Sequence, residues 1–341
     1  MKNTKFQTIL TAALSAAFLA ACGGGGGGGT AYEPAPIVTA SLNSANQNVV
    51  AQEATSSAFS AVSNSSSSAA ATLTGAQTVD ERALFSFVVS QLGKAPAYLA
   101  NAKENAALVG VVNSATVNCT YGGTMTVIVA DADNSGTLTA GDSLTITGNN
   151  CRDVSLGTIN GSSTLTFNNM SGTYGSTAYS AGLTMTFNNL SMVDGQYNVS
   201  INGTASLSET VTGANSWTST FAAPSLSMSA SYTGGGVRSR TLSAYSATET
   251  RTPDGTTRLS FAGAVTSSAL SSQTVTFNTT TPFVTLPNGV YPSSGVLLIT
   301  GAAGTQLKLT ALSASQVQQE LDANGDGIFE GNTTVNWNTL L

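Results

Sequence analysis

From Val111 to the C terminus, apolar and polar residues alternate with a period of two. Runs such as Met125-Thr-Val-Ile-Val129, Leu183-Thr-Met-Thr-Phe187 and Val275-Thr-Phe277 are separated by Gly, Asn and Asp. Successive side chains of a strand point to opposite faces, so this period gives one apolar face and one Thr/Ser face. The pattern predicts a mainly β domain over residues 110–341. Its antiparallel meander forms either a sandwich or a curved, partly open barrel.

One segment recurs within this region. Thr164-Leu-Thr-Phe-Asn-Asn169 returns 20 residues later as Thr184-Met-Thr-Phe-Asn-Asn189, and Val275-Thr-Phe-Asn278 is a shorter third copy. About twenty residues are enough for two strands and a turn. We therefore expect each copy to mark one hairpin of the meander, although two clear copies are too few to predict a solenoid.

Residues 39–109 show helical patterns instead. Leu42–Ser63 is predicted as a helix, and a Ser/Ala-rich linker without regular structure is the alternative. Its apolar face at i+4 spacing, with Phe59 beside it, consists of Val50, Ala54, Ala58 and Val62. Thr78–Leu92 begins with a capping-box pair, Thr78 and Glu81. Its apolar stripe consists of Leu84, Val88 and Leu92, with Phe85 alongside. A short helical piece is also expected over Ala97–Leu108. We expect these helices to pack on the sheet.

The N terminus has the pattern of an export signal. Lys2 and Lys5 precede an apolar run, Ile9–Ala21, which is shorter than the roughly 20 residues that span a bilayer. The following stretch, Leu19-Ala20-Ala21-Cys22, resembles the lipobox of bacterial lipoproteins. That resemblance implies a signal peptide over 1–21, a diacylglycerol on the Cys22 thiol and a third acyl chain on its amine. An ordinary secretory signal with a chance cysteine is the alternative.

Seven glycines, Gly23 to Gly29, follow Cys22 and lead into a Pro-containing segment. We predict that residues 22–38 form a flexible tether between the lipid and the folded body. Three acyl chains would make a permanent membrane anchor. Lipoproteins kept in the inner membrane often carry Asp where this chain has Gly23, so the resemblance implies the outer membrane. Lipobox, poly-Gly tether and β-rich body together resemble uncharacterised lipoproteins of Gram-negative bacteria.

Charge and composition exclude several function classes. The chain has 17 acidic and 11 basic residues, and loss of Lys2 and Lys5 with the signal would leave 17 against 9. An acidic protein lacks the basic patches that nucleic acids require, so no nucleic-acid partner is expected. The sequence contains no histidine, which excludes Ser-His-Asp triads and His-ligated zinc. We therefore expect no enzyme, and a carboxylate-dependent glycosidase is the one catalytic alternative left open.

The chain has three cysteines. With Cys22 assigned to lipid, Cys119 and Cys151 remain, and an exported protein meets an oxidising compartment. We predict a disulfide between these two residues, worth about 3–4 kcal/mol in the chain-entropy model. Two unpaired buried thiols are the alternative.

Two acidic loops resemble EF-hand and dockerin-type calcium loops. In the first, oxygen ligands fall at the expected spacing, with Gly136 at the sixth position, but strands rather than helices flank the loop. The predicted ligands of the first loop are Asp131, Asp133, Ser135, Thr137 (through its carbonyl) and Asp142. Those of the second, shorter loop are Asp322, Asn324, Asp326, Ile328 (through its carbonyl) and Glu330. We expect structural calcium in both loops, and metal-free Asp/Asn/Gly turns are the alternative.

Together these features predict a lipid-anchored outer-membrane lipoprotein that acts as a structural or ligand-binding module, bound to the membrane through its lipid. Whether its ligand is a protein, a glycan or a lipid is left open, and so is the face of the membrane it occupies. A surface-exposed adhesin or host-factor-binding lipoprotein is the second hypothesis, since Thr/Ser-rich sheets suit outward display.

Overall fold

The computed structural model describes residues 37–63, 84, 87–88, 111–153, 157–195, 197–232 and 235–341. These residues belong to one compact unit, Ile37–Leu341. The helix and strands are, in chain order, α1 (Gln47–Ser63), β1 (Val111–Asn118), β2 (Thr124–Asp131), β3 (Ser143–Asp153), β4 (Gly157–Gly172), β5 (Tyr179–Asp194), β6 (Tyr197–Gly213), β7 (Ser216–Tyr232), β8 (Val237–Arg251), β9 (Thr257–Ser267), β10 (Gln273–Thr285), β11 (Ser294–Thr300), β12 (Gln306–Ala311), β13 (Gln316–Asp322) and β14 (Gly331–Asn336). Short 3₁₀ turns are η2 (Ser268–Leu270), η3 (Ala302–Gly304) and η4 (Trp337–Thr339).

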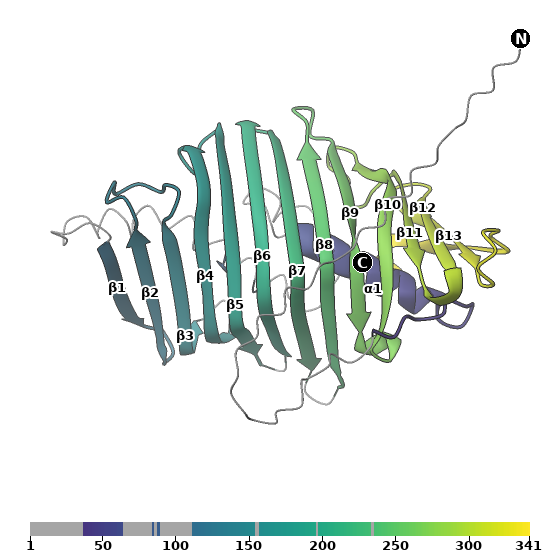
Figure 1. Ribbon diagram of the computed structural model, residues 1–341, viewed down its shortest axis with the longest axis horizontal. Coiled ribbons are helices and arrows are strands. Elements are labelled where there is room, and N and C mark those ends of the chain that lie inside the picture. Colours follow the sequence, from purple (N-terminus) through teal and green to yellow (C-terminus); the bar gives the residue numbers. More distant parts are fainter. Residues whose placement is uncertain are drawn as a thin grey trace, which may run out of the picture. The chain divides into compact units, whose positions relative to one another are not determined.

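The strands form a single 14-stranded sheet in sequence order, so that each strand pairs with the next along the chain (Figure 1). The pairing is antiparallel throughout. The predicted antiparallel meander is therefore confirmed. Within the described residues the sheet does not close, because β1 pairs only with β2 and β14 pairs only with β13.

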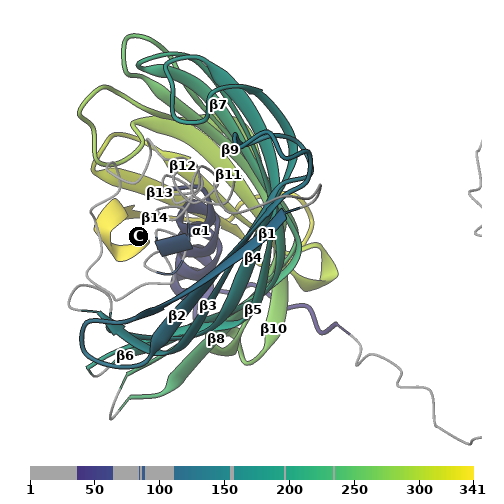
Figure 2. The same cartoon turned by 90° about the vertical axis from the view of Figure 1, so that its left-hand side faces the viewer.

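A line of irregular positions crosses the middle of the sheet. In β3, β4, β5, β6, β8 and β9 a residue with positive φ lies where the pairing register shifts. These residues are Asn150, Gly161, Asn189, Gly203, Ala244 and Gly263. At Gly161 a Cβ atom would lie 2.2 Å from the Asn189 carbonyl oxygen, so only glycine fits there. Because bulges bend strands, a row of them makes the whole sheet curve (Figure 2).

The two faces of the sheet differ as the alternation predicts. Inward-facing residues such as Leu165, Leu183 and Leu207 are buried. The outward face carries hydroxyl pairs between neighbouring strands, for example Thr145 with Thr164, whose Oγ1 atoms are 3.0 Å apart. The convex face therefore carries many hydroxyl side chains, and the apolar side chains lie on the concave face.

Helix α1 lies on the concave side of the sheet (Figure 2). Its buried apolar residues are Val50, Ala51, Ala54, Ala58 and Phe59. The Phe59 ring centroid lies 5.3 Å from that of Phe261 and 5.4 Å from that of Phe283. The predicted packing of an N-terminal helix against the sheet is thus confirmed. Aromatic contacts of Phe59 form part of this packing.

The predicted start of this helix is wrong by five residues. Instead of beginning at Leu42, α1 begins at Gln47. The side-chain oxygen of Asn46 accepts a hydrogen bond from the Asn43 backbone N–H at 2.9 Å, and that of Asn43 accepts one from the Asn46 backbone N–H at 3.2 Å. These reciprocal caps hold the chain out of the helix until Gln47. Upstream, Thr39 forms a parallel bridge with Thr274.

The second predicted helix lies largely outside the described residues. Of Thr78–Leu92, the structure describes Leu84, Phe87 and Val88, which are helical and belong to the buried core. The expected piece over Ala97–Leu108 lies outside the described residues, as do the signal peptide and Cys22. No helix in the described part of the chain is long and apolar enough to cross a membrane.

The internal repeat marks strands, and the prediction that each copy is a hairpin is wrong. The two copies lie in β4 and β5, which pair directly, so that Thr164 faces Thr186 and Thr166 faces Thr184. Each strand has 16 residues, and β5 begins 22 residues after β4, so the period of about twenty residues corresponds to one strand and its turn. The row of bulges explains the error, because strands that bend without ending look like two shorter strands in the sequence.

Candidate metal sites at both ends of the sheet

Both predicted metal loops connect the second strand of the sheet, counted from an edge, to its neighbour. The first joins β2 to β3 beside the edge strand β1, and the second joins β13 to the edge strand β14. Each loop begins at the last residue of a strand, Asp131 or Asp322, and its last acidic residue, Asp142 or Glu330, directly precedes the next strand. The two candidate sites therefore lie in the hairpins β2–β3 and β13–β14, here called the terminal hairpins; the second contains the edge strand β14, and the first lies next to the edge strand β1.

The first loop brings three carboxylates together. One oxygen from each of Asp131, Asp133 and Asp142 lies within 4.8 Å of the others. The Asp131 carboxylate accepts hydrogen bonds from the backbone N–H groups of Ser135 (3.1 Å) and Gly136 (2.9 Å). Asp131 and Asp142 are each 1% exposed. Three like charges repel at this distance, so the arrangement favours a cation among them.

Thr139 is a residue of this loop that the sequence did not indicate. Its hydroxyl donates to Asp133 Oδ2 at 3.0 Å, and its backbone N–H donates to Asp142 Oδ2 at 2.7 Å. Hydrogen bonds from Ser135 and Thr139 lower the pKa of the Asp133 carboxyl below its ordinary value. Thr139 thus links two of the three carboxylates and holds the third position of the loop against the twelfth.

The second loop reaches a similar arrangement with fewer residues. Oxygens from Asp322, Asp326 and Glu330 lie within 4.8 Å of one another. Buried Asp322 accepts hydrogen bonds from the backbone N–H groups of Gly325 (2.7 Å) and Gly327 (2.8 Å). Thr333, which holds the twelfth position, lies in β14 and pairs with Gln319. Glu330 at the ninth position therefore supplies the closing carboxylate.

The remaining predicted ligands lie in or beside these clusters. Ser135 Oγ donates to the Thr137 carbonyl at 3.0 Å, so two of the predicted oxygen ligands are already in contact. The Asn324 amide donates to Glu330 Oε1 at 2.5 Å. The backbone N–H of Ile328 donates to Asp326 Oδ1 at 2.8 Å. Both clusters could hold a metal ion, and their donors are the hard oxygens that calcium and magnesium prefer.

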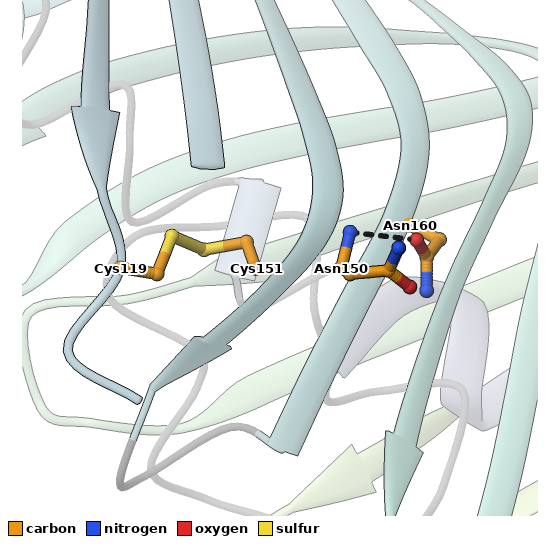
Figure 3. The surroundings of a disulfide bond; sticks show 4 residues. All are labelled: Cys119, Asn150, Cys151 and Asn160. Carbon is orange, nitrogen blue, oxygen red and sulfur yellow. Dashed lines mark hydrogen bonds between the residues drawn. A yellow bond between two sulfur atoms is a disulfide. The ribbon is translucent and has the colours of Figure 1, made fainter. Parts of the chain in front are cut away.

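A disulfide lies at the end of the β2–β3 hairpin that is remote from the acidic loop (Figure 3). Cys119, in the turn after β1, is bonded to Cys151 in β3, with a Cα–Cα distance of 5.3 Å. The predicted pairing is therefore present. It ties the β1–β2 turn to the end of β3 that is remote from the acidic loop. Next to it, the Asn150 backbone N–H donates to Asn160 Oδ1 at 2.8 Å. The disulfide and the acidic loop Asp131–Asp142 thus lie at opposite ends of the β2–β3 hairpin.

The concave face carries a set of buried charges that the sequence alone did not indicate. Glu53 of α1 is fully buried, and its Oε2 lies 3.0 Å from Arg240 Nε and accepts a hydrogen bond from Ser267 Oγ at 2.7 Å. Glu209 and Glu249 are two more acidic side chains on this face. The available signal was a charged residue at an inward position of an alternating run, as in Leu207-Ser-Glu209-Thr-Val211.

Burial raises the pKa values of Glu209 and Glu249. It raises the pKa of the Glu249 carboxyl to about 8, and the Arg251 guanidinium partly opposes that change. Burial also raises the pKa of Glu209, partly opposed by a hydrogen bond from the Tyr179 hydroxyl. Burial therefore favours the neutral form of both carboxyls.

Comparison with known proteins gives no independent assignment. No protein-family model, no curated protein and no solved structure matches this chain.

Proposed function

We propose that this protein is a lipid-anchored lipoprotein of the outer membrane, and that its β domain is a non-catalytic structural or ligand-binding module stabilised by calcium. The observation that carries the calcium part is the convergence of three carboxylates in each terminal hairpin of the sheet. The lipid anchor rests on the Leu19-Ala20-Ala21-Cys22 sequence and the glycine tether that follows it.

Calcium at these positions has a clear physical role. The ends of an open sheet are where strands separate most easily, since an edge strand has a partner on one side only. An ion bound only by the folded form stabilises that form by mass action. Calcium in the two loops would join the edge strand β14 to β13 at one end of the sheet, and would join β2, the partner of the edge strand β1, to β3 at the other end.

Several features favour calcium over magnesium. Calcium accepts six to eight oxygens in flexible geometry, whereas magnesium demands near-ideal octahedral geometry and usually keeps several waters. The first loop offers carboxylates, the Ser135 hydroxyl and the Thr137 carbonyl, a mixed oxygen set of the kind that EF-hand loops supply. The second loop adds the Asn324 side chain to its three carboxylates.

Native mass spectrometry of the protein with and without EDTA tests the calcium proposal. We expect two calcium ions per chain at millimolar calcium. Asp131→Asn and Asp322→Asn should each remove one ion, whereas Glu320→Asn, which changes an acidic residue paired with Lys308 at 2.8 Å, should keep both. A chain that binds no calcium at millimolar supply would overturn the proposal.

A separate fractionation experiment tests the anchor. We expect the full-length protein in the outer-membrane fraction and Cys22→Ser outside it, because that substitution removes the thiol that would carry the diacylglycerol. Retention of Cys22→Ser in the outer membrane would contradict lipid anchoring and would leave the calcium proposal untouched.

A further inference from the structure

One row of the concave face is polar where the next row toward the middle of the sheet is apolar. The strand register aligns Glu209 of β6, Ser219 of β7 and Glu249 of β8 side by side. The next row toward the middle of the sheet contains Leu207, Phe221 and Ala247 in the same three strands. Glu209 and Ser219 are 2% and 1% exposed. The fold thus places two carboxyls and a hydroxyl together at the inner surface, near one end of the strands.

The two carboxyls of this row and the neighbouring Arg251 guanidinium are incompletely satisfied. Glu209 Oε2 accepts a hydrogen bond from the Tyr179 hydroxyl at 2.6 Å, which fixes the direction of that carboxyl. Glu209 Oε1, Glu249 Oε2 and Arg251 Nε are shielded from solvent and have no hydrogen-bond partner among the described residues. Buried polar atoms without partners are rare and costly, so their presence in one place points to a molecule that binds them.

The chemistry of these atoms defines the class of that molecule. Arg251 Nε can only donate a hydrogen bond, so the ligand must accept one, which disfavours a bare cation or an ammonium group. The carboxyls of Glu209 and Glu249 need donors when ionised. Hydroxyl groups satisfy both demands, because each hydroxyl donates one hydrogen bond and accepts others.

Spacing and charge favour a ligand with several hydroxyls. Glu209 and Glu249 lie two strands apart, so their Cα atoms are separated by about 9–10 Å. A sugar ring carries hydroxyls on both sides of such a span, whereas a single small ion reaches both carboxyls only if both side chains lean inward. Burial also favours the neutral form of both carboxyls, which suits a neutral ligand.

We infer that this row, Glu209, Ser219, Glu249 and the adjacent Arg251, is a binding site for a neutral polyhydroxylated ligand, a sugar or a related polyol. Adjacent hydroxyls of the ligand donate to Glu209 Oε1 and Glu249 Oε2, and one of them accepts from Arg251 Nε. Glu249 and Arg251 are partly exposed long side chains, so they can move to admit the ligand. The inference does not depend on calcium or on the lipid anchor.

Saturation-transfer NMR on the full-length protein tests this site. The protein is kept in a detergent without a sugar head group and titrated with glucose, galactose, mannose and N-acetylglucosamine. We expect saturable binding of at least one of them below about 50 mM, the range of weak millimolar affinity. Glu209→Gln and Glu249→Gln should each weaken that binding about tenfold, because each replaces one oxygen of the carboxyl by an NH2 group, which cannot accept a hydrogen bond from the ligand.

Glu320→Gln is the matched control, since Glu320 lies in β13, away from this row, and pairs with Lys308. It should leave sugar binding unchanged. Melting curves and the calcium count of every variant, taken on the same samples, separate loss of this site from unfolding and from failure of the calcium proposal. Absence of saturable binding by all four sugars, or equal binding by wild type and both row variants, would overturn the inference and leave buried water as the occupant.

Discussion

The two ends of the sheet each bring three carboxylates together, but they do so with loops of different length. At both ends the loop starts with the last residue of a strand and closes with an acidic residue directly before the next strand. The first loop needs twelve residues, Asp131 to Asp142, and the second needs nine, Asp322 to Glu330. Only the first end has a disulfide. The position of the closing carboxylate therefore follows the start of the next strand and not a fixed count from the first aspartate.

A second difference concerns exposure. Both acidic ends of the first loop are buried, whereas in the second loop only Asp322 is buried, and Asp326 and Glu330 are exposed. A more enclosed site loses less affinity to competing water and is screened less by salt. We therefore expect the first loop to bind calcium more tightly than the second.

Among changes at a single position of the sheet, loss of the disulfide at the first end has the largest expected effect. Replacement of both Cys119 and Cys151 by Ser should lower the free energy of unfolding by about 3–4 kcal/mol, because the unfolded chain regains the freedom of the closed loop. Urea denaturation of the variant and the wild type measures the difference. An unchanged urea midpoint in the variant would mean that the disulfide does not stabilise the first end of the sheet.

Loss of a single calcium site should produce the next largest effect. At a calcium concentration about 100 times Kd, each occupied site stabilises the folded protein by about 2.7 kcal/mol. In EDTA the wild type should lose the contribution of both sites, and Asp131→Asn and Asp322→Asn should each lose only one. Denaturation curves with calcium and with EDTA test this, and equal curves for all three proteins in calcium would show that the loops do not stabilise the sheet.

Alkaline pH should distinguish the buried carboxyls of the concave face from the carboxylates at the two ends. The pKa of Glu249 is about 8 in the folded protein against 4.5 ordinarily, so this group destabilises the folded state increasingly as the pH rises from 4.5 to 8. Glu249→Gln cannot ionise and should be more stable than the wild type by about 1–3 kcal/mol at pH 9.

Denaturation at pH 4 and pH 9 checks this sign. The stability difference between Glu249→Gln and wild type should be small at pH 4, where the Glu249 carboxyl is neutral in both folded and unfolded chains. A wild type whose advantage over Glu249→Gln grows with pH would contradict the burial of this carboxyl.

The smallest effect is expected on the convex face between the two ends. Thr220 and Thr248 pair through their hydroxyls at 3.2 Å; Thr248 is exposed and Thr220 is partly exposed. Thr220→Val keeps the β-branched shape, so the change in unfolding free energy should stay within about 0.5 kcal/mol. A melting curve of the variant measures this change. A loss of several kcal/mol in the free energy of unfolding would mean that hydroxyl pairs on the convex face stabilise the sheet as much as the disulfide or the calcium sites do.

Much of the sheet could be predicted because alternation is a local signal. Runs such as Leu183–Phe187 fix which side chains face inward, and neighbouring strands then pair in sequence order. The curvature could not be predicted in the same way. It depends on the alignment of bulges at positions such as Gly161 and Gly203, and that alignment follows from pairing between strands.

The acidic loops could be predicted from local sequence, whereas the polar row of the concave face could not. Asp131 and Asp142 were identifiable because both lie within one short loop of known spacing. Glu209 and Glu249 are 40 residues apart, and only the register through Ser219 places them in one row. Ligands that come from one loop can be found in a sequence, whereas those brought together by a sheet require its pairing.

Hydrogen–deuterium exchange with calcium and with EDTA tests most directly whether calcium holds the two ends of the sheet. EDTA should increase exchange in peptides covering β2–β3 and β13–β14, with the smaller change at β2–β3, where the disulfide still holds the base of the hairpin. Peptides from β5 to β8 should be unaffected. Identical exchange of both terminal hairpins in calcium and in EDTA would contradict the role proposed for the two acidic loops.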